Sequence, residues 1–109
     1  MAAAEAVVAV LVTAPDAETG GRIARALVEE RLAACVNVVP GVRSIYRFEG
    51  AVHDDAEVLL IVKTRADRCD ELAARIRGLH PYALPEVLAL RAAGGSAEYL
   101  AWVGAEAAR

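Results

Sequence analysis

The side chain best placed to bind a metal ion is His80, which stands directly before Pro81 at the end of a predicted helix. A neutral imidazole there could bind copper or zinc. A protein metal site needs three or four ligands, and no second ligand lies at a fixed spacing from His80. A histidine at a helix end can instead interact with the last carbonyl groups and the negative end of the helix dipole. The sequence favours this structural role.

Two other groups could bind cations, and each has an ordinary structural explanation. His53, Asp54 and Asp55 follow a predicted hairpin turn, where they could hold a divalent cation weakly, although such a run is more often a solvated tip. Cys35 lies in an apolar stretch, where a thiol can bind copper but more often packs in a core. Because two cysteines do not make a disulfide framework, we predict that Cys35 and Cys69 are free thiols.

A third set of side chains could line a cleft between subunits. Lys63 beside Glu86 would form a polar pair in such a cleft, with aromatic residues as its walls. The same side chains could instead pack a subunit interface and satisfy one another's charges, and the sequence leaves both possibilities open. The set comprises Tyr46, Phe48, Lys63, Tyr82 and Glu86.

The sequence carries no signature of catalysis. A catalytic centre would need a nucleophile with its base, a pair of carboxylates or a phosphate-binding loop. The two histidines have no serine or cysteine partner in a motif, and Gly20-Gly21 lacks the lysine and the spacing of a nucleotide-binding loop. We therefore predict a protein that acts by binding rather than as an enzyme, and that requires no cofactor.

The first half of the chain predicts one helix among three strands. Residues 7–12 are continuously apolar, as in a buried strand, and Asp16 is a good cap for the helix that follows. Residues 34–49 form a long strand that is interrupted at Pro40-Gly41, where proline cannot donate a ladder hydrogen bond. A tight turn at Glu49-Gly50 then leads into an antiparallel strand over residues 52–64.

The second half predicts two more helices around a fourth strand. Thr64 can cap a helix that presents an apolar stripe and ends at Pro81. Residues 84–90 read as a strand, and Ser96 caps a final helix. The resulting βαββαβ order predicts a ferredoxin-like α+β fold with both crossover helices on one face of a four-stranded sheet. The stripe comprises Cys69, Leu72, Ile76 and Leu79, and the apolar face of the last helix comprises Tyr99, Trp102 and Val103.

Two patterns predict self-association. The strands over 7–12, 58–62 and 87–90 are apolar on both faces, whereas the crossover helices can cover only one face. A strand of about 13 residues spans roughly 43 Å, which exceeds the diameter of about 34 Å expected for a domain of this size. The alternative is that the C-terminal helix covers the open face of its own sheet. Residues expected in the core or the subunit interface are Cys35, Val58, Leu60, Val62 and Trp102.

Length and composition suit one domain over residues 1–109. Hydrophobic residues make up 57% of the chain, and the formal net charge of −3 argues against nucleic acid as a partner. No apolar run reaches the roughly 20 residues that span a bilayer, so no membrane association is expected. The first basic residue is Arg22, so the positive region of a signal peptide is missing, and we predict a cytoplasmic protein.

Several motifs in order make the chain resemble the CutA-type divalent-cation tolerance proteins. The resemblance runs from about Val7 to the C-terminus. It implies a ferredoxin-like homotrimer whose long hairpins clasp neighbouring subunits, a link to tolerance of copper and other divalent metals, and a general likeness to PII-type signal proteins. The motifs lie at residues 33–37, 40–41, 44–50, 57–64, 80–82, 85–86 and 99–102.

The chain departs from that family at the positions where some members bind copper. Ala14 stands where those members have a cysteine, and Leu79 replaces the first of two histidines, so that His80 alone remains. Phe48 stands where tryptophan is usual. We therefore expect Cu(II) and other divalent ions to bind only weakly.

Three functions follow as hypotheses. The first is a metal-tolerance homotrimer. The second is a PII-like sensor that binds a small anion or metabolite near Lys63, Arg65 and Glu86. The third is a trimeric scaffold for another protein.

Overall fold

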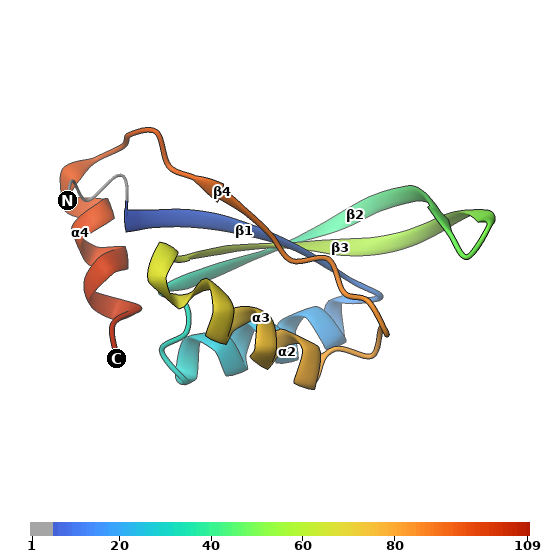
Figure 1. Cartoon of the computed structure of the whole chain (residues 1–109), viewed down its shortest axis with the longest axis horizontal. Helices are drawn as coiled ribbons and strands as arrows, with labels where there is room; N and C mark the ends of the chain where they lie inside the picture. Colours follow the sequence, from blue (N-terminus) through green and yellow to red (C-terminus); the bar gives the residue numbers. More distant parts are fainter. Residues whose placement is uncertain (1–5) are drawn as a thin grey trace.

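The computed structural model describes residues 6–109 and has an α+β fold (Figure 1). Its strands and helices follow one another in the predicted order, with an additional 3-10 turn before α3. The elements are β1 (Val7–Ala14), α2 (Ala17–Glu29), β2 (Cys35–Phe48), β3 (Ala51–Arg65), the 3-10 turn η1 (Ala66–Arg68), α3 (Cys69–Leu79), β4 (Leu88–Arg91) and α4 (Ala97–Glu106).

The four strands form an antiparallel sheet in the order β2-β3-β1-β4, which is the ferredoxin-like topology. Helices α2 and α3 lie side by side against one face of this sheet (Figure 1). Asp16 caps α2 as predicted, because its Oδ1 accepts a 2.7 Å hydrogen bond from the backbone N–H of Thr19. The fold class predicted from the sequence is confirmed.

The main core lies between this helix pair and the sheet. Alternate residues of the central strands point into it, as the two-residue period of a strand requires. Its fully buried side chains include Val10, Val12, Leu60 and Val62 from the sheet, Ile23 and Leu27 from α2, and Leu72 and Ile76 from α3, with Val58 at 5% exposure beside them.

Helix α2 lies close to the sheet at Gly20. A Cβ atom at this position would lie 2.9 Å from Cγ2 of Val58 and 3.2 Å from Cδ2 of Leu60. The neighbouring Gly21 has open space where its Cβ would lie. Gly20 therefore sets the distance between α2 and β3, whereas Gly21 does not.

The β2–β3 hairpin projects beyond the body of the molecule, as its length predicts (Figure 1). The longest dimension of the chain is 43 Å. The register shifts between Val39 and Val42, which confirms the bulge predicted at Pro40-Gly41. Glu49 and Gly50 both have positive φ, at 52° and 80°, and close the predicted two-residue turn.

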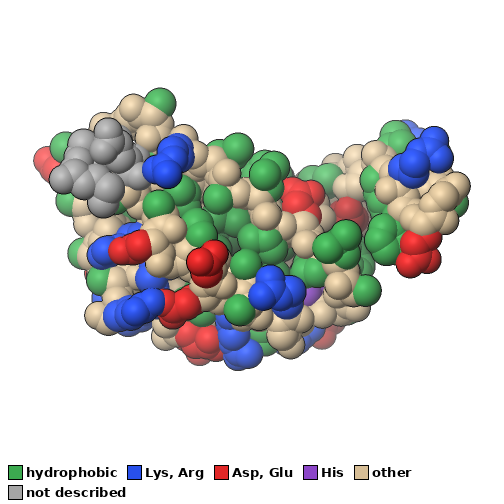
Figure 2. Space-filling view, viewed as in Figure 1, with side chains coloured by type: hydrophobic (Ala, Val, Ile, Leu, Met, Phe, Trp, Pro, Cys, Tyr) green, Lys and Arg blue, Asp and Glu red, His purple; other side chains and the backbone are tan. Residues whose placement is uncertain are grey.

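The second face of the sheet is left open by the helices of the same chain. Leu11, Leu59 and Ile61 alternate with core residues and are only partly buried, and Leu88 and Leu90 of β4 are 53% and 49% exposed. Figure 2 shows hydrophobic side chains gathered over the strands on the side away from α2 and α3. We call this surface, defined by those five leucine and isoleucine side chains, the open face.

Helix α4 does not cover the open face, so the alternative explanation for the two-sided strands is not realised within the chain. Leu100 and Val103 pack with Val7 and Ala34 at one end of the sheet. Three arginines then bind the last backbone carbonyls of α4: Arg31 donates to Ala105 and Ala108, Arg65 to Gly104, and Arg68 to Ala107. These donors hold the carbonyl groups at the end of α4 and in the two residues that follow it.

Three local predictions are wrong. Thr64 does not cap a helix: its buried hydroxyl donates a 2.7 Å hydrogen bond to the carbonyl of Leu32, and α3 has no side-chain cap. The fourth strand covers only Leu88–Arg91 and not residues 84–90, because the segment containing Pro85 leaves the sheet. Tyr99 and Trp102 are 43% and 44% exposed within the chain, so the buried face of α4 is made by other residues.

Within residues 6–109, no helix combines the length and the apolar character needed to cross a bilayer.

Candidate functional site

A cavity of about 630 Å³ lies where the projecting hairpin leaves the body of the molecule. Its walls come from the hairpin on one side and from the segment before β4 on the other. Figure 2 shows a hollow there, with acidic side chains at its base. Its lining residues are Thr13, Ser44, Ile45, Tyr46, Arg47, Phe48, Glu57, Tyr82, Ala83, Leu84, Pro85 and Glu86. The volume falls within the range of small-molecule sites.

The floor of this cavity is acidic. Glu57 is only 8% exposed, and the hydroxyl of Tyr82 donates a 2.7 Å hydrogen bond to its Oε2. Burial, followed by that hydrogen bond, raises the pKa of Tyr82 above its usual range. Burial, followed by the nearby Glu57 carboxylate, raises the pKa of Glu86. No ion pair within residues 6–109 includes either glutamate.

The hairpin wall adds the aromatic side chain of Tyr46, which contacts a carboxylate outside the lining. The hydroxyl of Tyr46 donates a 2.5 Å hydrogen bond to Oδ2 of Asp55, and this bond is the main reason that the pKa of Tyr46 is raised. The Tyr46 ring stacks on His53, with centroids 5.1 Å apart and planes 12° from parallel. These two contacts orient Tyr46 at the edge of the cavity.

Four of the five predicted cleft residues line this one cavity, and they do so within a single chain: Tyr46, Phe48, Tyr82 and Glu86. Lys63 is the exception, because its Nζ donates a hydrogen bond to Oδ1 of Asn37 and it is not part of the lining. Lys63 lies six residues beyond Glu57 along β3, or roughly 20 Å at 3.3 Å per residue. The predicted Lys63–Glu86 pair is therefore not formed within the chain.

His80 is held by protein partners at both ring nitrogens. Its Nε2 lies 2.7 Å from the carbonyl oxygen of Thr13, and its Nδ1 accepts a 3.1 Å hydrogen bond from the backbone N–H of Tyr82. These partners assign a neutral ring with the proton on Nε2. His80 is 8% exposed and packs against the Tyr82 ring at 4.6 Å. This arrangement orients the segment that forms the cavity wall.

The other candidate ligands do not converge. Asp54 forms a bidentate pair with Arg43, with contacts of 2.9 and 2.6 Å, while Asp55 faces Tyr46 on the opposite side of the hairpin. Cys35 and Cys69 are both partly buried and carry no disulfide. Burial raises the pKa of the Cys69 thiol. Residues 6–109 contain no group of three or more His, Cys, Asp or Glu side chains that could hold a metal ion.

Glu57 and Thr13 line the cavity but were not predicted as site residues. The sequence pattern could have indicated Glu57 but not Thr13. Glu57 is two residues from Leu59 and therefore in phase with the open face, where a carboxylate interrupts an apolar strand. Thr13 contributes mainly through the backbone carbonyl that binds His80, and side-chain chemistry does not reveal such a role.

The fold and the cavity together define a small ferredoxin-like protein with a projecting hairpin and an acidic cavity at the hairpin base. Residues 8–106 match a family model described as CutA1 divalent ion tolerance protein. The chain belongs to the CutA1 family, as the sequence motifs predicted.

Individual relatives agree with this assignment in sequence and in structure. The divalent-cation tolerance protein CutA of Thermus thermophilus is 54% identical over 94 residues, which cover 86% of this chain and 91% of that protein. A solved structure of the Thermus thermophilus protein has a TM-score of 0.89 at 51% identity and covers 92% of this chain and 97% of that one.

The names of more distant relatives mention different cellular compartments. A structure described as the periplasmic divalent cation tolerance protein CutA of Archaeoglobus fulgidus has a TM-score of 0.90 at 33% identity, with coverage of 94% of this chain and 99% of that one. The rice protein CutA 1, chloroplastic, is 48% identical over 88% of this chain, but this chain spans only 54% of that protein.

Proposed function

We propose that the chain acts as a cytoplasmic homotrimer in the tolerance of divalent metal ions, and that it acts by binding rather than by catalysis. The observation that carries the proposal is the open face, which no element within residues 6–109 covers. Exposed apolar patches of this kind mark association surfaces. The names of the related proteins support the link to divalent cations.

Light scattering coupled to size-exclusion chromatography tests the assembly. We expect a mass near three times the 11.5 kDa of the chain. Leu88→Lys and Leu90→Lys should break the assembly, because they place charges on the open face. Val28→Lys is the matched control, since Val28 is 40% exposed on α2 and lies on the other side of the sheet. A folded monomer of the unmodified chain at low micromolar concentration would refute the assembly.

The link to metal tolerance is tested in cells. A host that lacks its own CutA protein would express the chain or the Leu88→Lys variant, and growth would be followed in increasing copper and zinc. We expect the unmodified chain to restore growth and the variant to fail. Equal growth with and without the chain would argue against a role in tolerance.

Copper binding at His80 is proposed to be weak. Ala14 is fully buried, Leu79 cannot bind a metal, and the ring nitrogens of His80 already have partners. Calorimetric titration of Cu(II) should therefore give a dissociation constant far above the nanomolar range for both the unmodified chain and His80→Ala. Nanomolar binding that is abolished by His80→Ala would contradict this.

A second candidate is a small-molecule sensor, and the cavity at the hairpin base favours it. Its walls mix apolar, aromatic and carboxylate side chains, which is the usual composition of a metabolite site. The anionic ligand suggested by the sequence does not suit this cavity, because Lys63 and Arg65 lie elsewhere.

A further inference from the structure

We propose that the cavity at the hairpin base binds a small organic cation, whose ammonium or guanidinium group faces Glu57 and Glu86 and whose short apolar stem lies against the aromatic and aliphatic walls. This inference goes beyond metal tolerance and names a class of ligand for one cavity. The lining residues all belong to a single chain.

The first step is the charge of Glu57. Its side chain is buried at 8% exposure, and the Tyr82 hydroxyl supplies one hydrogen bond to one of its two oxygens. An ionised carboxylate can accept about four hydrogen bonds. None of the ion pairs among residues 6–109 includes Glu57, so a buried negative charge faces the cavity without a countercharge. A cation in the cavity would compensate that charge.

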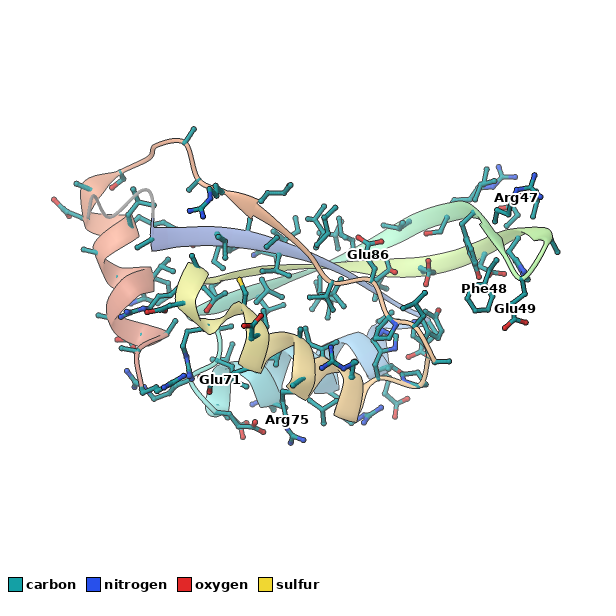
Figure 3. All side chains as sticks on the ribbon, in the orientation of Figure 1. Arg47, Phe48, Glu49, Glu71, Arg75 and Glu86 are labelled. Carbon is teal, nitrogen blue, oxygen red and sulfur yellow. The ribbon has the colours of Figure 1, made fainter. Side chains whose placement is uncertain are left out.

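The second step is the presence of Glu86 at the same cavity. Figure 3 labels Glu86 on the segment before β4, close to the base of the hairpin. The raised pKa of Glu86 has burial as its first cause and the Glu57 carboxylate as its second. Because both carboxyl groups line the same cavity, a cation bound between them would interact favourably with both.

The third step is the basic residue in the lining. Arg47 lies near the tip of the hairpin, and Figure 3 shows its side chain on the opposite side of the hairpin from Phe48. The pairing of Arg47 with Val52 and of Phe48 with Ala51 gives the same alternation. Arg47 therefore borders the rim and leaves the acidic floor unneutralised.

The fourth step separates an organic cation from a metal ion. The described residues provide no cluster of three ligating side chains, and a cavity of about 630 Å³ is far larger than a metal ion needs. Tyr46, Phe48 and Tyr82 supply ring faces to which ammonium and guanidinium groups are attracted. Leu84 and Pro85 supply apolar surface for a short stem.

The test uses four probes with a short alkyl stem: butylammonium, butylguanidinium, butyrate and 1-butanol. Each is titrated into the unmodified protein in its native assembly at pH 7.5 and low salt, with binding followed by amide chemical shifts in NMR. We expect the two cations to shift the amides of Tyr46, Tyr82 and Glu86 saturably, and we expect butyrate and butanol to give at least tenfold weaker effects. Equal binding of butanol would overturn the proposal.

Variants locate the interaction. Glu86→Gln and Glu57→Gln should each weaken butylammonium binding at least tenfold, whereas Glu29→Gln should leave it unchanged, since Glu29 is exposed on α2 and pairs with Arg25. Glu86 is exposed, so Glu86→Gln keeps the test valid even if the buried Glu57→Gln variant does not fold. Unchanged affinity in Glu86→Gln would overturn the proposal.

A titration with zinc and copper separates this inference from the proposed function. If the metals shift the cavity amides and the organic cations do not, the inference fails while the metal-tolerance function stands. If the unmodified chain proves to be a monomer yet binds butylammonium at Glu86, the assembly fails and the inference stands.

Discussion

The hydroxyl of Tyr82 and the carboxylate of Glu57 are joined by a 2.7 Å hydrogen bond across 25 positions of sequence. This bond connects the segment after α3 to the base of the β2–β3 hairpin and so closes the floor of the cavity. His80 stabilises the same segment from the other side, through its bonds to Thr13 and to the backbone of Tyr82. The shape of the cavity therefore depends on two adjacent polar anchors.

Tyr82→Phe should destabilise the protein, because Glu57 would stay buried and lose a hydrogen bond. The expected loss is about 1 to 2 kcal/mol in the free energy of unfolding, measured by urea denaturation at fixed protein concentration. Tyr99→Phe is the control, since Tyr99 is exposed on α4, and it should change stability by less than about 0.5 kcal/mol. A loss of the same size in both variants would argue against a specific role for the Tyr82–Glu57 bond.

Glu86 should make the stability depend on pH in an unusual direction. Its pKa is raised in the folded chain, chiefly by burial and then by Glu57, from an ordinary value of 4.5. The folded state therefore holds the proton more tightly than the unfolded state, so this contribution is present below about pH 4.5 and is lost as the pH rises through the folded pKa.

The effect of Glu86 is isolated by comparison with Glu86→Gln, which does not titrate. The unfolding free energy of the unmodified chain minus that of the variant should fall as the pH rises above about 4.5. A difference that is constant or that rises over this range would contradict the raised pKa.

Gly20→Ala should destabilise the chain even though alanine favours helices. The new Cβ would lie 2.9 Å from Cγ2 of Val58, so α2 would have to move away from β3. Overpacking of this kind typically costs about 1 to 3 kcal/mol, which exceeds the gain of about 1 kcal/mol in helix propensity. Gly21→Ala has open space and should instead raise the unfolding free energy by about 0.5 to 1 kcal/mol, and thermal unfolding distinguishes the two.

Arg68→Leu should loosen the end of the chain. Arg68 is 6% exposed and donates to the carbonyls of Ala107 and Arg31 and to Oε2 of Glu71. Its loss leaves buried acceptors without donors, which costs about 1 to 3 kcal/mol. Hydrogen exchange should show faster exchange in α4. Arg25→Leu, at an exposed helical pair, should leave exchange in α4 unchanged.

Much of the fold could be predicted because its signals are local. The Asp16 cap, the Glu49-Gly50 turn and the Pro40-Gly41 bulge each follow from the backbone preferences of the residues involved. Leu72 and Ile76 were placed in the core by helical spacing alone. These elements needed no knowledge of distant contacts.

The failures share a dependence on contacts far apart in sequence. Thr64 has the chemistry of a helix cap, but Leu32 offers its hydroxyl a buried partner 32 positions away. Helix α4 is nearly apolar all round, so spacing could not tell that Leu100 faces the sheet while Trp102 remains exposed within the chain. The sequence does not reveal the register of β3, and this is why it allowed a pair between Lys63 and Glu86 that the structure does not form.

The bulge at Pro40-Gly41 also has a consequence for how the outer edge of β2 meets other strands. An edge strand of 14 residues offers a long row of unpaired backbone groups, which could template further strands from other molecules. Pro40 has no backbone N–H to donate to an added strand. The register shift beside it bends β2, so the outer edge of this strand changes direction there. A long, regular ladder along this edge would therefore be interrupted at Pro40-Gly41, which disfavours the continuous strand pairing on which fibril growth depends.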